Sequence, residues 1–66
     1  MAEIFDRLLL KPEVAERARL SLPTIWREQR AGRFPRFERL SAGRVGLRES
    51  RLAEWIAGRR DWSEAR

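Results

Sequence analysis

The feature that most constrains this sequence is the absence of cysteine and histidine from a chain of only 66 residues. Disulfide bonds, zinc-finger ligation and imidazole acid–base chemistry all need one of these two residue types. A chain of this length supports one hydrophobic core and buries only about 60% of the surface that its unfolded form exposes. We therefore expect a single domain over residues 1–66, with its core at about 8–58, held by packing alone and without a metal or cofactor.

The sequence gives no sign of a membrane or secretory segment. No apolar run approaches the roughly 20 residues that are needed to cross a bilayer. The first residues include Glu3 and Asp6, where a secretory signal would carry basic residues. We expect a cytoplasmic, nucleoid-associated protein with neither a membrane nor a small-molecule substrate as its partner.

Positive charge is concentrated in one segment. The net charge is +5, and the whole excess lies between Arg27 and Arg51, where eight arginines stand against three glutamates. All basic residues except Lys11 are arginine, whose planar guanidinium suits phosphate groups and guanine edges. This pattern is typical of a surface that binds a polyanion. Charge alone leaves a solvated, arginine-rich surface open as an alternative.

The first half of the chain predicts two short helices. Pro12 suits the first turn of a helix that runs to about Ala18, because the missing proline N–H would be unpaired there anyway. The apolar stretch Leu8 to Leu10 before it is expected to form an extended edge segment. Ser21 offers a side-chain oxygen to cap a second helix, which should run from Leu22 to Ala31.

The second helix has two different faces. The face expected to point inward is formed by Leu22, Ile25, Trp26 and Gln29. The opposite, polar face is formed by Pro23, Thr24, Arg27 and Arg30. We expect Gln29 either at the rim of the core or hydrogen-bonded, because burial without a partner would cost about 1 to 3 kcal/mol. Trp26 is expected to pack at the flank of this helix with its ring edge near a phosphate.

A basic hairpin is expected to follow the second helix. Residues 36–40 and 44–48 fit two short strands around a turn in which Gly43 is free to take a positive φ. Phe37 and Leu40 are three residues apart and cannot both face inward on a regular strand. We therefore expect a β-bulge or a short pairing in the first strand.

A third helix is expected after the hairpin. Ser50 would cap this helix, which should bury Leu52, Trp55 and Ile56 and end near Gly58. Trp55 is expected in the core, because a domain of this size needs the volume of a large apolar ring. The tail over residues 60–66, which contains Trp62, is expected to be loose.

Together these elements predict a winged helix-turn-helix, mainly α-helical, with three short helices and a two- or three-stranded antiparallel wing. In such a fold the second helix enters the major groove of double-stranded DNA, and the wing lies on the phosphates or in the minor groove. Thr24 and Arg27 are the predicted base readers, Pro23 would touch a thymine methyl, and Ser21 would hold a phosphate at the helix N-terminus. Contacts to the DNA backbone are predicted for Trp26, Arg30, Arg33, Arg36, Arg39, Arg44 and Arg48.

An ordered series of motifs extends from Leu8 to Ile56. It includes Leu20-Ser21, Thr24-Ile25-Trp26-Arg27, Gly32-Arg33-Phe34-Pro35 and Arg48-Glu49-Ser50. The series resembles the AlpA family of phage-type transcriptional regulators over about residues 8–58. The resemblance implies a MerR-like winged helix-turn-helix of bacteria and prophages that acts as a DNA-binding activator or as an excisionase-like factor. Arg19 departs from the family pattern, which usually has glycine in that turn.

Two alternatives to a DNA-binding regulator stay open, and an enzyme is disfavoured. Catalysis needs convergent groups in a pocket, whereas the carboxylates of this chain are scattered. A protein-binding adaptor could dock an acidic partner through the arginine face, and its binding would be indifferent to DNA sequence. An excisionase that bends DNA would use the same fold as a regulator. No heptad pattern would build a dimer, so we expect a monomer in solution that assembles cooperatively on adjacent DNA sites.

Overall fold

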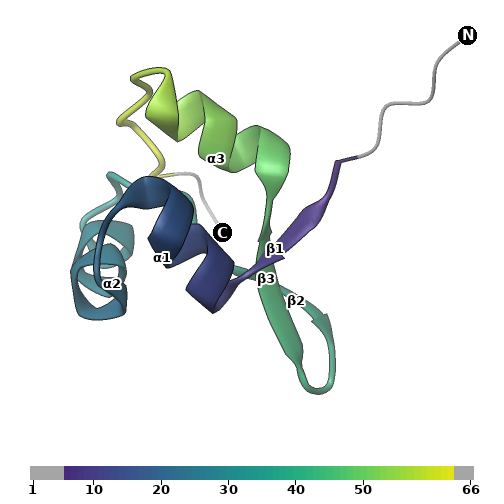
Figure 1. Ribbon diagram of the computed structural model, residues 1–66. Coiled ribbons are helices and arrows are strands. Elements are labelled where there is room, and N and C mark those ends of the chain that lie inside the picture. Colours follow the sequence, from purple (N-terminus) through teal and green to yellow (C-terminus); the bar gives the residue numbers. More distant parts are fainter. Residues whose placement is uncertain (1–5, 64–66) are drawn as a thin grey trace, which may run out of the picture.

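Three short helices pack beside one small sheet in the computed structural model, which describes residues 6–63 (Figure 1). The elements are β1 (Leu8–Leu10), α1 (Lys11–Ala18), α2 (Leu22–Arg30), β2 (Glu38–Ser41), β3 (Arg44–Arg48) and α3 (Glu49–Ile56). This arrangement confirms the predicted fold class, a mainly helical winged helix-turn-helix. Residues 1–5 and 64–66 of the predicted single domain lie outside the described residues.

The sheet joins the start of the chain to the wing. Strand β3 is central and pairs antiparallel with both edge strands, β1 and β2. Leu9 lies opposite Leu47, so β1 is the extended edge segment that the sequence predicts. Gly46 allows the close approach of β1, because a Cβ atom at this position would lie 2.6 Å from the carbonyl oxygen of Leu9.

The wing itself consists of β2, β3 and a short turn. A register shift between Arg39 and Ser41 confirms the predicted irregularity of the first strand. The prediction for Gly43 is wrong, because the glycines with positive φ in residues 6–63 are Gly32 and Gly58. Ser41 is already paired with Arg44, so the turn is tight, and the register shift beside it supplies the local twist.

The hydrophobic core draws on both helical and strand elements. It is formed by Leu9, Val14, Ala18, Ile25, Phe34, Leu47 and Leu52. Trp55 is half-buried against this core, with its ring centroid 4.8 Å from that of Phe34. The indole N–H of Trp55 donates to the carbonyl oxygen of Arg33 at 3.1 Å, so its polar edge has a partner. The loop before the wing is thereby held against α3.

The inward face of α2 is narrower than predicted. Ile25 and Gln29 are buried, whereas 39% of Leu22 and 61% of Trp26 are exposed. The expectation that the latter two point inward is therefore wrong. The reason is that α2 packs mainly against α1, so only a stripe with i, i+4 spacing is covered. Gln29 fulfils its expectation, because its side-chain amide donates to the carbonyl oxygen of Pro35 at 3.0 Å.

The start of α3 also differs from the prediction. Ser50 lies within the first turn of α3 instead of capping it from outside, and the N-cap residue Arg48 makes no side-chain cap hydrogen bond. The backbone N–H of Ser50 donates to Asp6 Oδ1 at 2.9 Å, and its hydroxyl donates to Asp6 Oδ2 at 2.7 Å. A carboxylate from before β1 thus satisfies this helix end. Ile56, expected inside, is 57% exposed because Leu52 and Trp55 form the inner face of α3.

The described part of the tail after α3 is anchored by Trp62, which corrects the expectation of a loose segment for residues 60–63, whereas residues 64–66 lie outside the described residues. Trp62 is only 2% exposed, and its backbone N–H donates to the carbonyl oxygen of Gly32 at 2.7 Å. Its ring lies beneath the guanidinium carbon atoms of Arg59, at 3.7 Å, and of Arg51, at 5.0 Å. The chain returns because Gly58, with φ at +121°, ends the helical path and a large indole ring is stabilised by burial.

Candidate nucleic-acid interface

The two helices of the helix-turn-helix are joined by a tight turn at Arg19. This residue has φ of 61° and ψ of 37°, a left-handed conformation that usually favours glycine. Its N–H and that of Leu20 both donate to the carbonyl oxygen of Ala15, which closes the end of α1. The turn therefore keeps its shape although the glycine suggested by the resemblance is absent.

A series of hydrogen bonds connects three polar side chains on the exposed side of α2. Thr24 donates its backbone N–H to Ser21 Oγ at 3.3 Å, which confirms Ser21 as the predicted cap. The hydroxyl of Ser21 donates to Thr24 Oγ1 at 2.9 Å, and Arg27 Nη2 donates to the same oxygen at 3.3 Å. These side chains lie together at the N-terminal half of α2, and the first turn has no acidic residue. The positive end of the helix is therefore unopposed.

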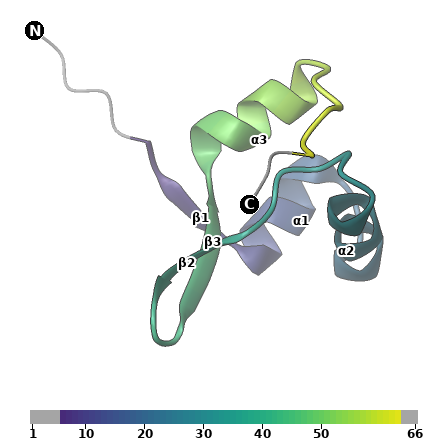
Figure 2. The ribbon, with the colours of Figure 1, turned by 180° about the vertical axis from the view of Figure 1, so that it is seen from behind.

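Five arginines on α2, on the wing and in the loop between them have no carboxylate partner in the described part of the chain. Within residues 6–63, none of them has a carboxylate oxygen within 4 Å, and all are exposed: Arg27, Arg30, Arg36, Arg39 and Arg44. Both ribbon views show α2 and the tip of the wing extending away from α3, on either side of α1 (Figures 1 and 2). We call these five residues together with Thr24 the α2–wing face.

Two of the predicted backbone contacts are engaged within the protein. Arg33 makes a bidentate pair with Glu28, with N···O distances of 2.8 and 3.1 Å. This pairing lowers the pKa of the Glu28 carboxyl and raises that of the Arg33 guanidinium. Arg48 Nε donates to Glu38 Oε1 at 3.3 Å and also approaches Asp6. The structure therefore does not group these two guanidiniums with the α2–wing face.

Sequence reasoning missed an apolar cleft between α2 and the wing. One cavity of about 310 Å³ is lined by Lys11, Leu22, Pro23, Trp26 and Phe37. An adjoining cavity of about 280 Å³ is lined by Trp26, Gln29, Arg30, Arg36 and Phe37. The sequence could have indicated this cleft only through the aromatic character of Trp26 and Phe37, because these two residues lie on different elements and periodicity does not show that they share a cavity.

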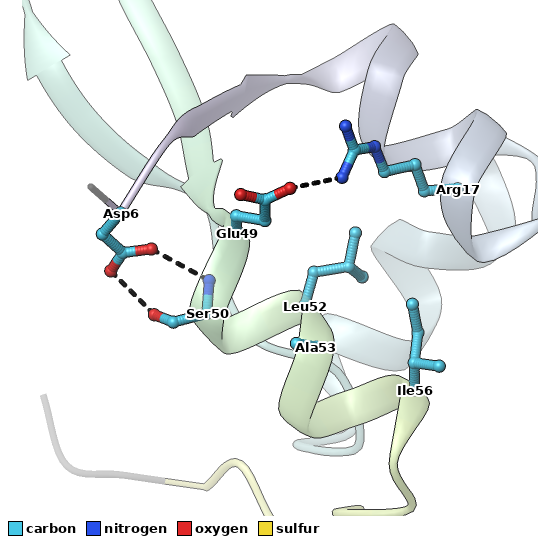
Figure 3. Close-up of a pocket in the computed structure, with 7 residues that line it drawn as sticks. All are labelled: Asp6, Arg17, Glu49, Ser50, Leu52, Ala53 and Ile56. Carbon is cyan, nitrogen blue, oxygen red and sulfur yellow. Dashed lines mark hydrogen bonds and ion pairs between the residues drawn. The ribbon is translucent and has the colours of Figure 1, made fainter. Parts of the chain in front are cut away.

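The opposite end of the molecule has another cavity, of about 480 Å³ (Figure 3). It is lined by Asp6, Arg17, Glu49, Ser50, Leu52, Ala53 and Ile56, which we call the α3 end. Figure 3 shows both of its carboxylates engaged, Asp6 by Ser50 and Glu49 by Arg17 Nη1 at 2.7 Å. Hydrogen bonds from Ser50 are the main reason that the pKa of Asp6 lies below its ordinary value. These groups stabilise the fold by pairing with one another.

Residues 6–63 contain no group of three or more acidic, histidine or cysteine side chains that could hold a metal ion. None of the described helices is long and apolar enough to cross a membrane. The α2–wing face is therefore the most distinctive candidate site of the described residues.

The chain matches one known protein family. A family model described as the prophage CP4-57 regulatory protein (AlpA) matches residues 7–60. No curated protein and no solved structure gave a match. The matched range includes both helices of the helix-turn-helix, the whole wing and α3, and it agrees with the resemblance in the motifs. The chain belongs to the AlpA family of prophage regulatory proteins.

Proposed function

We propose that this protein binds double-stranded DNA in a sequence-specific manner and acts as a small prophage-type transcriptional regulator. The observation that carries the proposal is the α2–wing face, whose exposed arginines have no carboxylate partner among residues 6–63 and whose helix N-terminus is exposed. A surface of this kind attracts the phosphates of a duplex and presents a helix to its major groove. The regulatory role given in the family description supports the same function.

Within this proposal, α2 reads the bases and the wing holds the backbone. Thr24 and Arg27 face base edges, Pro23 contacts a thymine methyl, and Ser21 with the free amides of the first turn holds a phosphate. Backbone contacts come from Arg30, Arg36, Arg39 and Arg44. Arg33 and Arg48 can join them only by leaving their carboxylate partners, which exposed ion pairs allow at little cost. The protein is a monomer in solution that assembles on adjacent sites.

The decisive experiment compares two arginines on a duplex selected from a random pool. Replacing Arg27 by alanine should weaken binding to the selected duplex by about 1 to 3 kcal/mol and relax sequence preference, because a guanidinium on a base edge is lost. Arg17→Ala is the matched control, since Arg17 is paired with Glu49 at the α3 end. It should leave the affinity for DNA unchanged.

A salt titration on the same duplex measures the phosphate contacts. If four or five arginines engage, the slope of log K against log salt should be about −3.6 to −4.5. A wild-type protein that binds selected and scrambled duplexes equally well would contradict sequence-specific binding. Binding to an acidic protein with no affinity for any duplex would favour the adaptor instead.

A further inference from the structure

The apolar cleft between α2 and the wing is lined in part by large apolar side chains that the core leaves exposed. Its two cavities share Trp26 and Phe37, so they form one continuous cleft beside the α2–wing face. We propose that this cleft holds one sugar–phosphate strand of the bound duplex, with deoxyribose against Trp26 and Phe37 and phosphates at Lys11, Arg30 and Arg36. This inference rests on the proposed DNA binding and assigns a new subsite to it.

The floor of the cleft is apolar and open. Trp26 is 61% exposed and Leu22 is 39% exposed, although a domain of this size has little apolar surface to spare for its core. Exposed large apolar side chains that adjoin a cavity mark an interaction surface more often than isolated ones do. Phe37 is half-buried and completes the floor from the wing side. Such a floor fits the apolar faces of sugar rings.

The rim of the cleft is cationic. Lys11 Nζ lies 5.6 Å from the centroid of the Phe37 ring, and the guanidinium carbon of Arg30 lies 5.2 Å from that of the Trp26 ring. Arg36 lines the same cleft, and no carboxylate does. The cations are therefore held against the aromatic rings with their charge uncompensated. A purely apolar occupant would leave these charges unpaired.

A strand of DNA backbone fits both the apolar floor and the cationic rim of the cleft. It alternates apolar sugar with anionic phosphate, as the cleft alternates aromatic floor with cationic rim. Pro23 lines the cleft and also belongs to the polar face of α2, so a duplex seated on that face passes the cleft without a break. A base methyl would fit the floor but would give the three rim cations no anion. The observations therefore favour the backbone.

The test is Trp26→Ala, measured on the selected duplex and on a scrambled one. Affinity should fall about tenfold on both, since the contact carries no base identity, and Trp26→Phe should retain most of it. Ile56→Ala is the matched control, because Ile56 is similarly exposed, at 57%, but belongs to the α3 end. It should bind as the wild type does. Thermal unfolding of each variant checks that the fold is unchanged.

Fluorescence gives a second readout. Trp26 is the exposed member of the three tryptophans, since Trp62 is buried and Trp55 half-buried. Adding the duplex should protect wild-type fluorescence from acrylamide, and Trp26→Phe should lack most of this protection. Acrylamide is suitable because it is uncharged and is not repelled by DNA.

The outcomes separate the two proposals. If the wild type binds no duplex, the proposed function fails and the subsite with it. If the wild type binds and Arg27→Ala weakens it, but Trp26→Ala binds normally and acrylamide protection is absent, only the subsite is overturned. A loss in Trp26→Ala that is confined to thymine-containing sites, and that thymine-to-uracil replacement reproduces in the wild type, would place a base methyl in the cleft and also overturn the subsite.

Discussion

The α2–wing face and the α3 end use the same residue type in opposite ways. At the α3 end, Arg17 lies 2.7 Å from Glu49 and 3.7 Å from Glu13, so its charge is neutralised within the protein. On the α2–wing face, Arg27 and Arg44 have no such partner among residues 6–63. The two regions therefore also differ in charge, because Asp6 and Glu49 lie beside Arg17 at the α3 end. The position of the carboxylates distinguishes them.

This difference bears on where a polyanion would bind. Uncompensated cations close together repel one another, and a bound phosphate relieves that repulsion. A paired arginine would first have to lose its carboxylate, so it contributes less to binding. Under the proposed function, this difference predicts DNA contacts on α2 and the wing and none at the α3 end.

The largest expected effect is a difference in the free energy of unfolding between two tryptophan variants, one in the tail after α3 and one beside the α2–wing face. Trp62→Ala should lower the free energy of unfolding by about 3 to 5 kcal/mol, because a buried ring between Arg51 and Arg59 is lost. Trp26→Ala should change it by no more than about 0.5 kcal/mol, because that ring is exposed on the α2–wing face. Urea denaturation followed by circular dichroism measures both.

Equal stability of Trp62→Ala and Trp26→Ala would contradict the predicted difference between the two tryptophans. It would mean either that the tail around Trp62 contributes little to the fold or that Trp26 is needed for packing. A loss confined to Trp62→Ala would show that the returning tail, which bonds to Gly32, helps to fix the loop between α2 and the wing. That loop connects α2 to the first strand of the wing.

Local signals in the sequence were sufficient to predict much of this molecule. Ser21 was identified as a helix cap, and its partner Thr24 is only three residues away. The irregular strand was predicted from the spacing of Phe37 and Leu40, and the register shift lies within that strand. The outer face of α2 followed from helical periodicity alone. In each case the information lies within one element.

Errors occurred where the partner is distant in the chain. The first turn of α3 is satisfied by Asp6, which is 44 residues away from Ser50 and belongs to no motif. Trp62 lies beyond the periodic pattern. It is buried because the tail returns to Gly32, which is distant in the chain. Trp26 was placed partly inside because periodicity cannot reveal how wide a stripe the neighbouring α1 covers. The pairing of Arg48 with Glu38 likewise depends on the strand register.

A smaller effect tests the comparison within one strand, since Arg44 and Arg48 both belong to β3. Arg44→Ala should reduce the magnitude of the salt slope by about 0.9, because one phosphate contact is lost on every sequence alike. Arg48→Ala should leave the slope nearly unchanged, because Arg48 is held by Glu38 and Asp6. Salt titrations of both variants on one duplex give the answer. Equal reductions would show that paired arginines also engage DNA and would extend the α2–wing face toward α3.

The smallest expected effect concerns the pH dependence of the α3 end. The pKa of Asp6 lies below its ordinary value of 3.8, because it accepts two hydrogen bonds from Ser50 and lies near Arg48. A carboxyl with a lowered folded pKa stabilises the fold above its unfolded pKa, and this stabilisation is lost as the pH falls through the folded value. Asp6→Asn should therefore be less stable than the wild type at pH 7, and the difference should shrink below about pH 3.8.

Ser50→Ala is the matched control for this pH effect. It removes the hydroxyl that donates to Asp6 but keeps the backbone N–H, so its loss of stability at pH 7 should be smaller than that of Asp6→Asn. Urea denaturation at pH 7 and at pH 3 measures the free energy of unfolding of all three proteins. Neither variant should change the affinity for DNA at pH 7, because both residues belong to the α3 end. A weakened affinity at unchanged stability would show that this end also takes part in binding, and the separation of the two regions would fail.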